Sequence, residues 1–553
     1  MTPRSTWIVV ALGTVSCATP PTPLAPVIGE LPTAAEALPG APPPARLRLS
    51  EVQASNVSTW MPAPGVTPDW IEVVNLGDTA LALVDIVVQV GSARGRAGTQ
   101  GTLAPGERLL LVAEGDEGEG RLPFALSASG EDIELSYQGV VTDRLRTGPL
   151  GPDRAWARFP AADLDGAWLP TARPTPGAPN GSRPPDSLDP SDLLFDTTRI
   201  YALELGLGQA ARNALDANPY TDVEGSFAFE GLTYPCVTMR KKGVYGSLRN
   251  FDRKVGLKVD LNACGGNALR GLETLTLNNM VQDPSSVHEA LIYGWMRARG
   301  LPAPRTGWVR LSVDGEDFGF YTWIETPDEN LLARWWSDPT GTLYEGSYGT
   351  DFYPGYEPYF EADQSANPDD RSDLTVVIDV LQRAPDDDAL AALEALVDVD
   401  QFLDVLAVEA ISLHWDGYTT SNNYRIYRDP ADGRFDLMTW GMDQTFVDRY
   451  LGPYDGRGAL FTWCLRNHAC AVRYDEALLR AADDWELHAF EVRMDTFLAL
   501  VTPQVETEPR LEWGMETHAA YVGATRAWMA EAPGVVREAV AARRRARAAG
   551  QVP

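Results

Sequence analysis

The sequence predicts a multidomain protein in which an all-β sandwich precedes an α+β domain. The chain has 553 residues, which is more than one hydrophobic core usually serves. Residues 46–180 contain short runs of alternating apolar residues separated by Gly, Pro and Asp, a pattern typical of sandwiches. Residues 181–195 form a short linker, and beyond it strand-like and helix-like patterns are mixed.

The N-terminus has the features of an export signal. Arg4 precedes the apolar run Trp7–Leu12, which is followed by small residues and then Cys17. This arrangement resembles a bacterial lipoprotein signal, so we expect residues 1–17 to direct export and Cys17 to be lipidated and held at a membrane. Plain secretion is the alternative. The sequence therefore predicts an exported protein, either a cell-envelope lipoprotein or a secreted one.

Residues 18–45 are rich in Pro and Ala and contain no periodic apolar residues, which predicts a linker. Such a segment spans roughly 30 Å as a coil, or on the order of 85 Å when mostly polyproline-like. Either length suits a domain held away from a membrane surface.

The chain is strongly acidic. It contains 46 Lys and Arg against 77 Asp and Glu, a formal net charge of −31. This balance argues against nucleic-acid binding, because phosphate contacts need a basic surface that displaces counterions. Solubility in an extracytoplasmic or salty environment explains the acidity well.

Apart from Cys17, four cysteines remain, and an even number in an exported chain predicts two disulfides. A bond between Cys464 and Cys470 would close a short loop, and one between Cys236 and Cys264 would join neighbouring strands. A metal site that uses His468 with Cys464 and Cys470 is the alternative, although the spacing fits no common zinc pattern.

Residues 46–180 resemble the lamin-tail domain, an immunoglobulin-like sandwich found in many exported bacterial proteins. The resemblance implies a fold and says little about activity, because a fold does not determine a function. It rests on four runs in order: Ser50–Asn56, Asp69–Asn75, Phe124–Glu131 and Pro174–Asn180.

The α+β domain, residues 196–553, begins with strand-like patterns and ends with helical ones. Runs such as Ile200–Leu205 and Val255–Leu261 predict a small antiparallel sheet. Apolar residues at helical spacing predict helices over Val399–His414 and through most of residues 475–549.

An Asp, an Asn and a second Asp follow one another within this domain. Asp416 comes directly after the predicted helix, Asn423 opens a short strand, and Asp443 follows the partner strand of the same hairpin. The hairpin is expected to bring Asn423 and Asp443 to one end, beside Asp416. Phosphoryl-transfer enzymes use such a set, in which one carboxylate orients the acceptor while an amide oxygen and another carboxylate hold Mg²⁺. Taken singly, each residue also fits a turn or a helix cap.

A basic, glycine-containing turn lies earlier in the domain. Arg240, Lys242 and Gly243 are followed by Lys254 and Lys258. Close backbone approach and nearby cations suit a polyphosphate, whereas a solvated basic hairpin is the alternative. Cations are scarce in this acidic chain, which favours the polyphosphate site.

Residues 195–470 resemble the CotH family, the spore coat protein H kinases, which have an atypical protein-kinase fold. The motifs include the basic turn, Leu277–Asn279, Gly319–Tyr321, Leu343–Glu345 and the Asp–Asn–Asp set. The family often has Asp where this chain has Gly441, so one metal contact is missing from the pattern.

This resemblance implies roles for individual residues. Asp416 would be the catalytic base, and Asn423 and Asp443 would bind Mg²⁺. The residues expected near ATP are Arg240, Lys242, Gly243, Lys254 on the phosphates, Glu289 as the ion-pair partner of Lys254, and Glu325 in a hinge-like position.

The predicted function is that of an exported, ATP- and Mg²⁺-dependent kinase that phosphorylates Ser or Thr on an extracytoplasmic protein. Adenylyl transfer and amino-acid ligation are alternatives on the same fold. A non-catalytic surface lipoprotein with a kinase-like binding module is a third, favoured by Gly441 and by the scarcity of ATP outside the cytoplasm. Retention of Asp416, Asn423 and Asp443 favours an enzyme.

Overall fold

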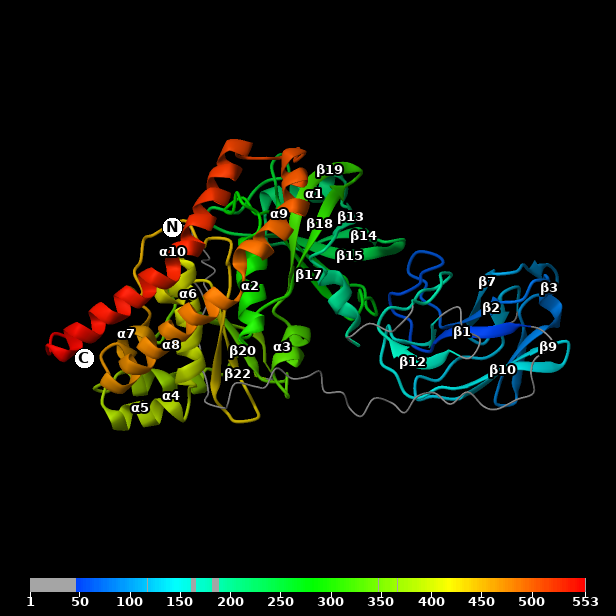
Figure 1. Cartoon of the computed structure of the whole chain (residues 1–553), viewed down its shortest axis with the longest axis horizontal. Helices are drawn as coiled ribbons and strands as arrows, with labels where there is room; N and C mark the ends of the chain where they lie inside the picture. The colour runs from blue at the N-terminus through cyan, green and yellow to red at the C-terminus, as the bar shows by residue number, and fades with distance from the viewer. Residues whose placement is uncertain are drawn as a thin grey trace.

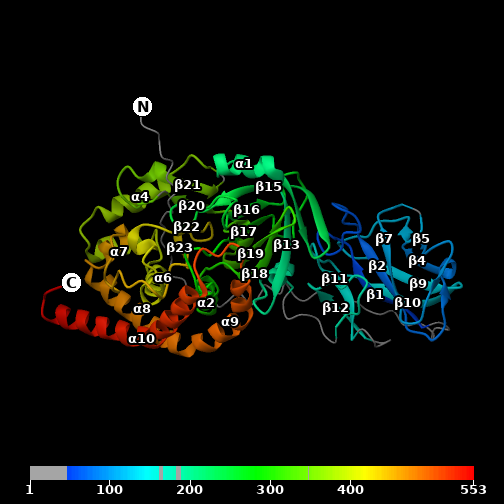
Figure 2. The same cartoon turned by 90° about the horizontal axis from the view of Figure 1, so that it is seen from above.

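The computed structural model describes residues 46–116, 118–160, 166–181, 188–346, 348–365 and 367–552. The predicted signal (1–17) and the N-terminal linker (18–45) lie outside these residues. A β-rich part, blue to cyan, lies beside a larger α/β part, green to red (Figures 1 and 2). The two parts touch around residues 58–65, where the Gly65 amide donates to the Thr233 carbonyl at 3.0 Å and Met61 packs into the neighbouring core.

The N-terminal part consists of two main sheets that share one hydrophobic core. The alternating strands predicted for residues 46–180 are therefore present, while the lamin-tail identity stays a prediction. The larger sheet has the order β12 (Ala167–Thr171), β11 (Ala155–Phe159), β1 (Leu47–Gln53), β2 (Trp70–Asn75), β7 (Arg108–Ala113) and β8 (Arg121–Leu122). The smaller has the order β10 (Val140–Arg146), β9 (Asp132–Tyr137), β4 (Ile86–Val90) and β5 (Ala93–Arg96), and β3 (Leu81–Ala82) pairs with β6 (Thr102–Leu103).

The α/β part begins with a closed barrel, whereas a small antiparallel sheet was predicted. Parallel pairing of β13 (Ile200–Gly206) with β18 (Thr306–Val313) closes it, and sequence periodicity does not report such long-range pairing. The remaining strands in order are β14 (Val223–Phe229), β15 (Leu232–Lys242), β16 (Gly256–Asp260), β17 (Thr274–Asn278) and β19 (Glu316–Glu325). Helix α1 (Gly208–Ala217) follows β13.

The second half of this part combines a sheet with helices. The sheet has the order β21 (Phe360–Gln364), β20 (Thr342–Gly346), β22 (Tyr424–Arg428) and β23 (Phe435–Thr439). The helices are α2 (His288–Ala298), α3 (Glu329–Trp335), α4 (Ser372–Leu381), α5 (Asp387–Glu394), α6 (Val399–Ser412), α7 (Ala459–Cys464), α8 (His468–Leu487), α9 (Phe490–Glu506) and α10 (Met515–Ala548). Figure 2 shows α4, α7, α8, α9 and α10 along the outer edge, with α2 and α6 further inside. The sheet is joined to its helices by one large core and, at α3, by a separate small cluster.

The end of the predicted 181–195 linker is ordered structure. Pro190–Phe195 forms a 3-10 helix, η2, and Leu194 and Phe195 pack into the barrel core. Short 3-10 turns have little periodicity, so a Pro- and Ser-containing stretch of this kind resembles a linker in sequence.

Both predicted disulfides, Cys236–Cys264 and Cys464–Cys470, are formed. The alternative metal site at Cys464, His468 and Cys470 is therefore wrong, because a disulfide leaves no thiolate to bind a metal.

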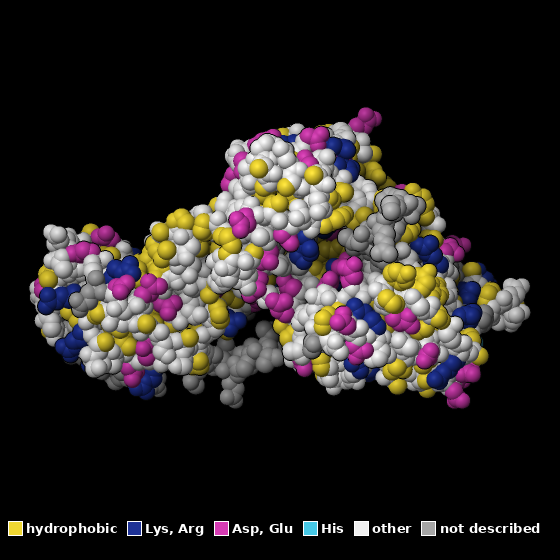
Figure 3. Space-filling view, turned by 180° about the vertical axis from the view of Figure 1, so that it is seen from behind, with side chains coloured by type: hydrophobic (Ala, Val, Ile, Leu, Met, Phe, Trp, Pro, Cys, Tyr) yellow, Lys and Arg dark blue, Asp and Glu magenta, His cyan; other side chains and the backbone are white. Residues whose placement is uncertain are grey.

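In the described part of the chain, no helix is both long and apolar enough to cross a bilayer. On the face seen in Figure 3, acidic and basic side chains are interspersed and basic ones form no large patch. The expectation that the protein does not bind nucleic acid stays a prediction.

Arg305 joins η2 to the barrel and is expected to be essential for stability. Its side chain is buried and forms ion pairs with Glu325 at 2.5 Å, Asp192 at 2.5 Å and Asp189 at 3.1 Å. Asp189 and Asp192 are partly exposed, but removing Arg305 leaves the buried Glu325 carboxylate with only Arg334, at 3.5 Å. We expect Arg305→Ala to lower the free energy of unfolding by about 3–5 kcal/mol, measured by urea denaturation.

A surface arginine provides the control. Arg526 pairs with Asp495 between two exposed side chains, so Arg526→Ala is expected to change stability by less than about 1 kcal/mol. Equal effects of the two substitutions would contradict a special role for Arg305.

Candidate active site

The loop after α6 holds Asp416 in a fixed position. The helix ends at Ser412, two residues before the predicted His414, because Leu413 adopts a left-handed conformation with φ of 58°. His414 is buried and forms a hydrogen bond to the Trp440 carbonyl at 2.9 Å. Burial lowers the pKa of His414 to about 4, so its ring is neutral at physiological pH. The start of the loop is therefore attached to packed structure.

Amide side chains surround the Asp416 carboxylate. Asn422, Asn423 and Gln444 each donate to it at 2.8 Å. Burial raises the pKa of Asp416, and these three hydrogen bonds oppose the rise. The Asn423 nitrogen points at Asp416, which turns its amide oxygen, the atom that binds cations, away from it. The predicted neighbourhood of Asp416 and Asn423 is thus present, and Gln444 is a member that the sequence did not single out.

Asp443 follows β23 in the same site and faces α2. Asn278 donates to Glu289 at 2.7 Å and approaches Asp443 at 3.5 Å, so one amide bridges two buried carboxylates. Burial raises the pKa of both acids, and the charge of Lys242 opposes the rise. Asp443 raises the pKa of Glu289 further, whereas Asp283 and Asp416 raise that of Asp443. Lys242 is therefore the cation that acts on this carboxylate pair.

The predicted ion pair between Lys254 and Glu289 is wrong, because Lys254 has another partner. Lys254 is buried and binds Glu508 at 3.0 Å, a residue of the C-terminal helical region, rather than Glu289. Burial lowers the pKa of Lys254 and the nearby Glu508 carboxylate opposes that effect. Strand register explains why Lys242, and not Lys254, faces Glu289. Lys242 pairs with Gly256 at the end of the sheet where Asn278 lies, whereas Lys254 lies in the turn that precedes β16.

The other expected nucleotide contacts are dispersed. Glu325 is buried and its carboxylate accepts hydrogen bonds from Arg305 at 2.5, 2.9 and 3.1 Å, so it is occupied on the η2 side. Gly243 has φ of 102°, and a side chain there would meet Ser247 Oγ at 2.6 Å, which explains a glycine at this turn. Arg240 is exposed and opposite Lys258 in the ladder. Their roles toward ATP stay predictions.

The position of the missing family carboxylate has a structural explanation. Gly441 has φ of 66°, and an added Cβ would lie 3.1 Å from the Asn423 Cγ. The Trp440 amide also donates to the Asn423 carbonyl at 2.8 Å, which fixes the two chains at this distance. A side chain at 441 therefore competes for space with a predicted Mg²⁺ ligand.

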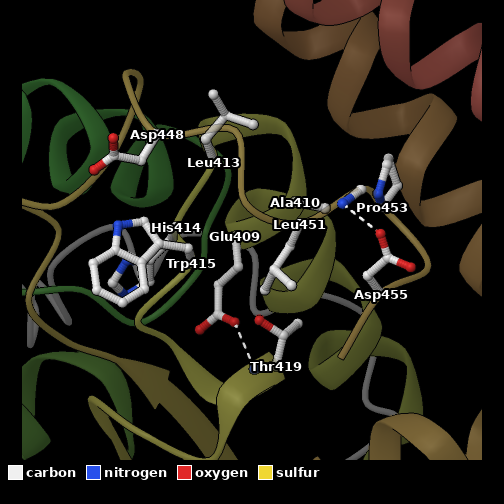
Figure 4. Close-up of a pocket in the computed structure, with 11 residues that line it drawn as sticks. Glu409, Ala410, Leu413, His414, Trp415, Thr419, Asp448, Leu451, Pro453 and Asp455 are labelled. Atoms are coloured by element: carbon white, nitrogen blue, oxygen red, sulfur yellow. Dashed lines mark hydrogen bonds between the residues drawn. The ribbon is translucent and has the colours of Figure 1, made fainter. Parts of the chain in front are cut away.

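A buried glutamate, Glu409, forms hydrogen bonds to the Asp416 loop. It lies in α6 beside a small cavity lined also by His414, Trp415 and Thr419 (Figure 4). Its carboxylate accepts from the Tyr418 amide at 3.0 Å, the Thr419 amide at 3.2 Å and the Thr439 hydroxyl at 2.9 Å. Burial raises the pKa of Glu409 to about 7. This residue links α6, the Asp416 loop and β23.

Comparison with known proteins finds a family match over part of the chain. Residues 240–466 match the family model described as CotH kinase protein. Residues 240–466 are similar to the CotH family. All the predicted site residues, from Arg240 to Asp443, lie inside this range, whereas Glu508 lies outside it.

The similar proteins include two fungal invasins and one bacterial coat protein. Invasin CotH2 of Rhizopus delemar is 26% identical over 246 residues, which are 41% of this chain and 41% of the invasin. Invasin CotH3 of the same fungus is 25% identical over 282 residues, 47% of this chain and 46% of its own length. Inner spore coat protein H of Bacillus subtilis is 24% identical over 191 residues, 32% of this chain and 51% of its own. The chain thus spans about half, or less, of each relative.

Replacing Glu409 is expected to loosen the Asp416 loop. Glu409→Ala leaves two backbone amides and one hydroxyl without their acceptor, which costs about 2–4 kcal/mol of unfolding free energy. Hydrogen exchange should accelerate at the amides of residues 415–423. Asp400→Ala, at a partly exposed position of the same helix, is the matched control and should leave that exchange unchanged.

The effect of Glu409→Ala also depends on pH. The folded pKa of about 7 is above the ordinary value of 4.5, so the stability that Glu409 contributes is greatest below pH 4.5 and is lost as pH rises through 7. The stability difference between wild type and Glu409→Ala should therefore be larger at pH 5 than at pH 8. A difference independent of pH would contradict the raised pKa.

Adding one methyl group at Gly441 tests the spacing. Gly441→Ala forces a left-handed residue with a Cβ and pushes the Asn423 side chain, at a cost of about 1 kcal/mol or more. A crystal structure of the variant should show the Asn423 amide displaced from Asp416. Gly433→Ala, in the turn at the other end of the hairpin, has similar backbone strain without this contact and should leave Asn423 in place.

Proposed function

We propose that the α/β part is an ATP- and Mg²⁺-dependent protein kinase that phosphorylates Ser or Thr on an exported protein. The observation that supports it most directly is the grouping of Asp416, Asn423 and Asp443 at one end of the β22–β23 hairpin, with Lys242 acting on Asp443. The similarity of residues 240–466 to CotH kinase proteins supports the same assignment.

The donor set fits Mg²⁺. Asp443 supplies a carboxylate and Asn423 an amide oxygen, both hard oxygen ligands, and Mg²⁺ is usually held by one or two protein groups together with water and substrate phosphates. Among the described residues no group of three or more His, Cys, Asp and Glu is arranged to hold a metal. When bound, Mg²⁺ supplies charge neutralisation for the transferred phosphoryl group.

The residues of this chain have distinct parts in the transfer. Lys242 lies where its charge reaches the carboxylate pair and offsets phosphate charge. Asp416 accepts the proton of the acceptor hydroxyl, and Asn422 and Gln444 keep its carboxylate oriented. The hydroxyl oxygen forms a bond to the γ-phosphorus as the bond to the bridging oxygen breaks, and ADP leaves.

A tyrosine-rich segment beside the loop supports a polypeptide acceptor. Its exposed tyrosines have between 37% and 56% of their surface accessible. The segment is attached to the Asp416 loop, since the Gly349 amide donates to the Ser421 carbonyl and Ser421 donates to Asp351 at 2.6 Å. Exposed aromatic rings near a reaction centre are typical of protein-docking surfaces. The tyrosines are Tyr348, Tyr353, Tyr356 and Tyr359.

Export is part of the proposal. The disulfides Cys236–Cys264 and Cys464–Cys470 favour an oxidising compartment. The relatives are named as invasins and as a spore coat protein, which supports a surface or extracellular location. Anchoring through Cys17 and a binding role for the lamin-tail-like part belong to the same proposal.

A binding module without catalysis is the second candidate, and Gly441 is the observation that favours it. Adenylyl transfer or ligation on the same fold would use the same metal ligands. Intact-mass analysis of the acceptor separates these outcomes, because phosphate, adenylyl and glutamyl groups add different masses.

Two substitutions test the proposal through nucleotide binding. We expect Asp443→Asn to weaken MgATP binding at least about tenfold, because a charged metal ligand is lost, and Asp416→Asn to preserve binding while abolishing transfer. Isothermal titration of the full-length protein with MgATP provides the affinities, and radiolabelled phosphate incorporation provides the activity.

Asp432→Asn is the matched control, since Asp432 lies in the exposed turn at the far end of the same hairpin. It should leave affinity and transfer unchanged. Absence of MgATP binding by wild type would refute the kinase assignment, and binding without transfer in wild type would support the binding module.

A further inference from the structure

The loop between the last two helices crosses onto the barrel. Residues 507–514, here called the α9–α10 loop, connect α9 to α10, and α9 lies beside β18 and β19 in both cartoon views (Figures 1 and 2). The loop lies outside the 240–466 match to the CotH model. Its acidic residues nevertheless contact the predicted phosphate-binding region.

Glu508 is inserted into the barrel wall. Its side chain is 1% exposed and binds Lys254 at 3.0 Å, while the Phe320 amide donates to the same carboxylate at 2.8 Å. Gly319 provides the space, because an added Cβ would lie 1.7 Å from Glu508 Oε1. The glycine at 319 is thus explained by the close approach of this carboxylate.

Glu512 holds the other part of the same region. Arg249 Nε lies 2.7 Å and 2.9 Å from its two oxygens, and Arg253 lies 2.5 Å from one of them. Arg249 and Arg253 both belong to the turn between β15 and β16, residues 243–255, here called the β15–β16 turn. Glu508 and Glu512 therefore bind this turn at Lys254, Arg249 and Arg253.

The β15–β16 turn is connected directly to the candidate active site. Asn279 donates to the Ser247 carbonyl at 2.9 Å and to the Lys254 carbonyl at 2.8 Å, so it joins the two ends of the turn. Its neighbour Asn278 bridges Glu289 and Asp443. The turn also begins directly after Lys242. A shift of the turn would therefore move the groups that face the transferred phosphates.

We propose that Glu508 and Glu512 are positioning residues that hold the β15–β16 turn in the geometry that binds the nucleotide phosphates. The inference rests on the proposed function for its consequence in ATP binding. The proposal assigns a role to the C-terminal helical region. The β15–β16 turn would have its phosphate-binding geometry only while the α9–α10 loop is bound to it.

Amide hydrogen exchange on the full-length protein without nucleotide tests the attachment itself. We expect Glu512→Gln to accelerate exchange in residues 243–255 at least about fivefold, because two ion pairs to the turn are lost. Glu508→Gln and Gly319→Ala should both accelerate it as well, the second by displacing the Glu508 carboxylate without removing any charge. Glu486→Gln is the control, since Glu486 pairs with Arg537 on the exposed side of α8.

Affinity for MgATP tests the consequence. Each of the three substitutions should raise the Kd about tenfold, with the control unchanged. Arg249→Gln leaves the Arg253–Glu512 pair in place and should raise the Kd by less than Glu512→Gln does. The double variant should bind MgATP no more weakly than Glu512→Gln alone, because Arg249 acts through Glu512. A generally destabilised protein would instead show additive losses.

The outcomes separate the two proposals. Unchanged exchange in residues 243–255 for both glutamate variants overturns the positioning role. Faster exchange with unaltered MgATP affinity overturns it too, because the two glutamates would then hold the turn without any effect on nucleotide binding. If wild type binds no MgATP, the proposed function fails, and the attachment of the turn is still decided by the exchange data.

Discussion

The pairing of β22 with β23 is the constraint on which the rest of the site depends. Tyr424 lies opposite Thr439, so the residues just outside the hairpin, Asn423 and Trp440, are joined by a backbone hydrogen bond of 2.8 Å. This register sets the positions of Asn423 and Asp443 relative to each other. Glu409 then extends the constraint, because it binds Thr439 and the Asp416 loop at once. Three elements are thereby fixed around one predicted metal site.

Buried charge around this site is balanced in separate groups. Arg305 neutralises Glu325 on the η2 side, Lys254 neutralises Glu508 on the C-terminal side, and Lys242 acts on Asp443 and Glu289 at the centre. Each isolated charge would be costly to bury, so every group needs its partner. Lys242 faces two buried carboxylates, Asp443 and Glu289, and a divalent cation bound there would complete the charge balance.

Local sequence patterns predicted which residues form the site better than they predicted the residues that contact them. The helix before Asp416, the hairpin and the order of Asp416, Asn423 and Asp443 follow from periodicity and turn residues, which act over short distances. The contributions of Glu409 and Gln444, and the parallel closure of β13 on β18, come from contacts between distant segments that leave no periodic signal. Glu508 is 254 residues from Lys254, so that ion pair is invisible to any local pattern.

Gly441 is explained by the same packing that organises Asn423. The family pattern suggests a lost metal ligand, yet a side chain there would contact the Asn423 amide at 3.1 Å and disturb its bond to Asp416. Glycine thus avoids both a strained left-handed side chain and a tight contact with Asn423. Since Mg²⁺ commonly takes few protein ligands and several phosphate or water oxygens, one carboxylate fewer is compatible with nucleotide binding. In the proposed site, glycine at 441 would therefore alter the arrangement of the metal ligands without ruling out metal binding.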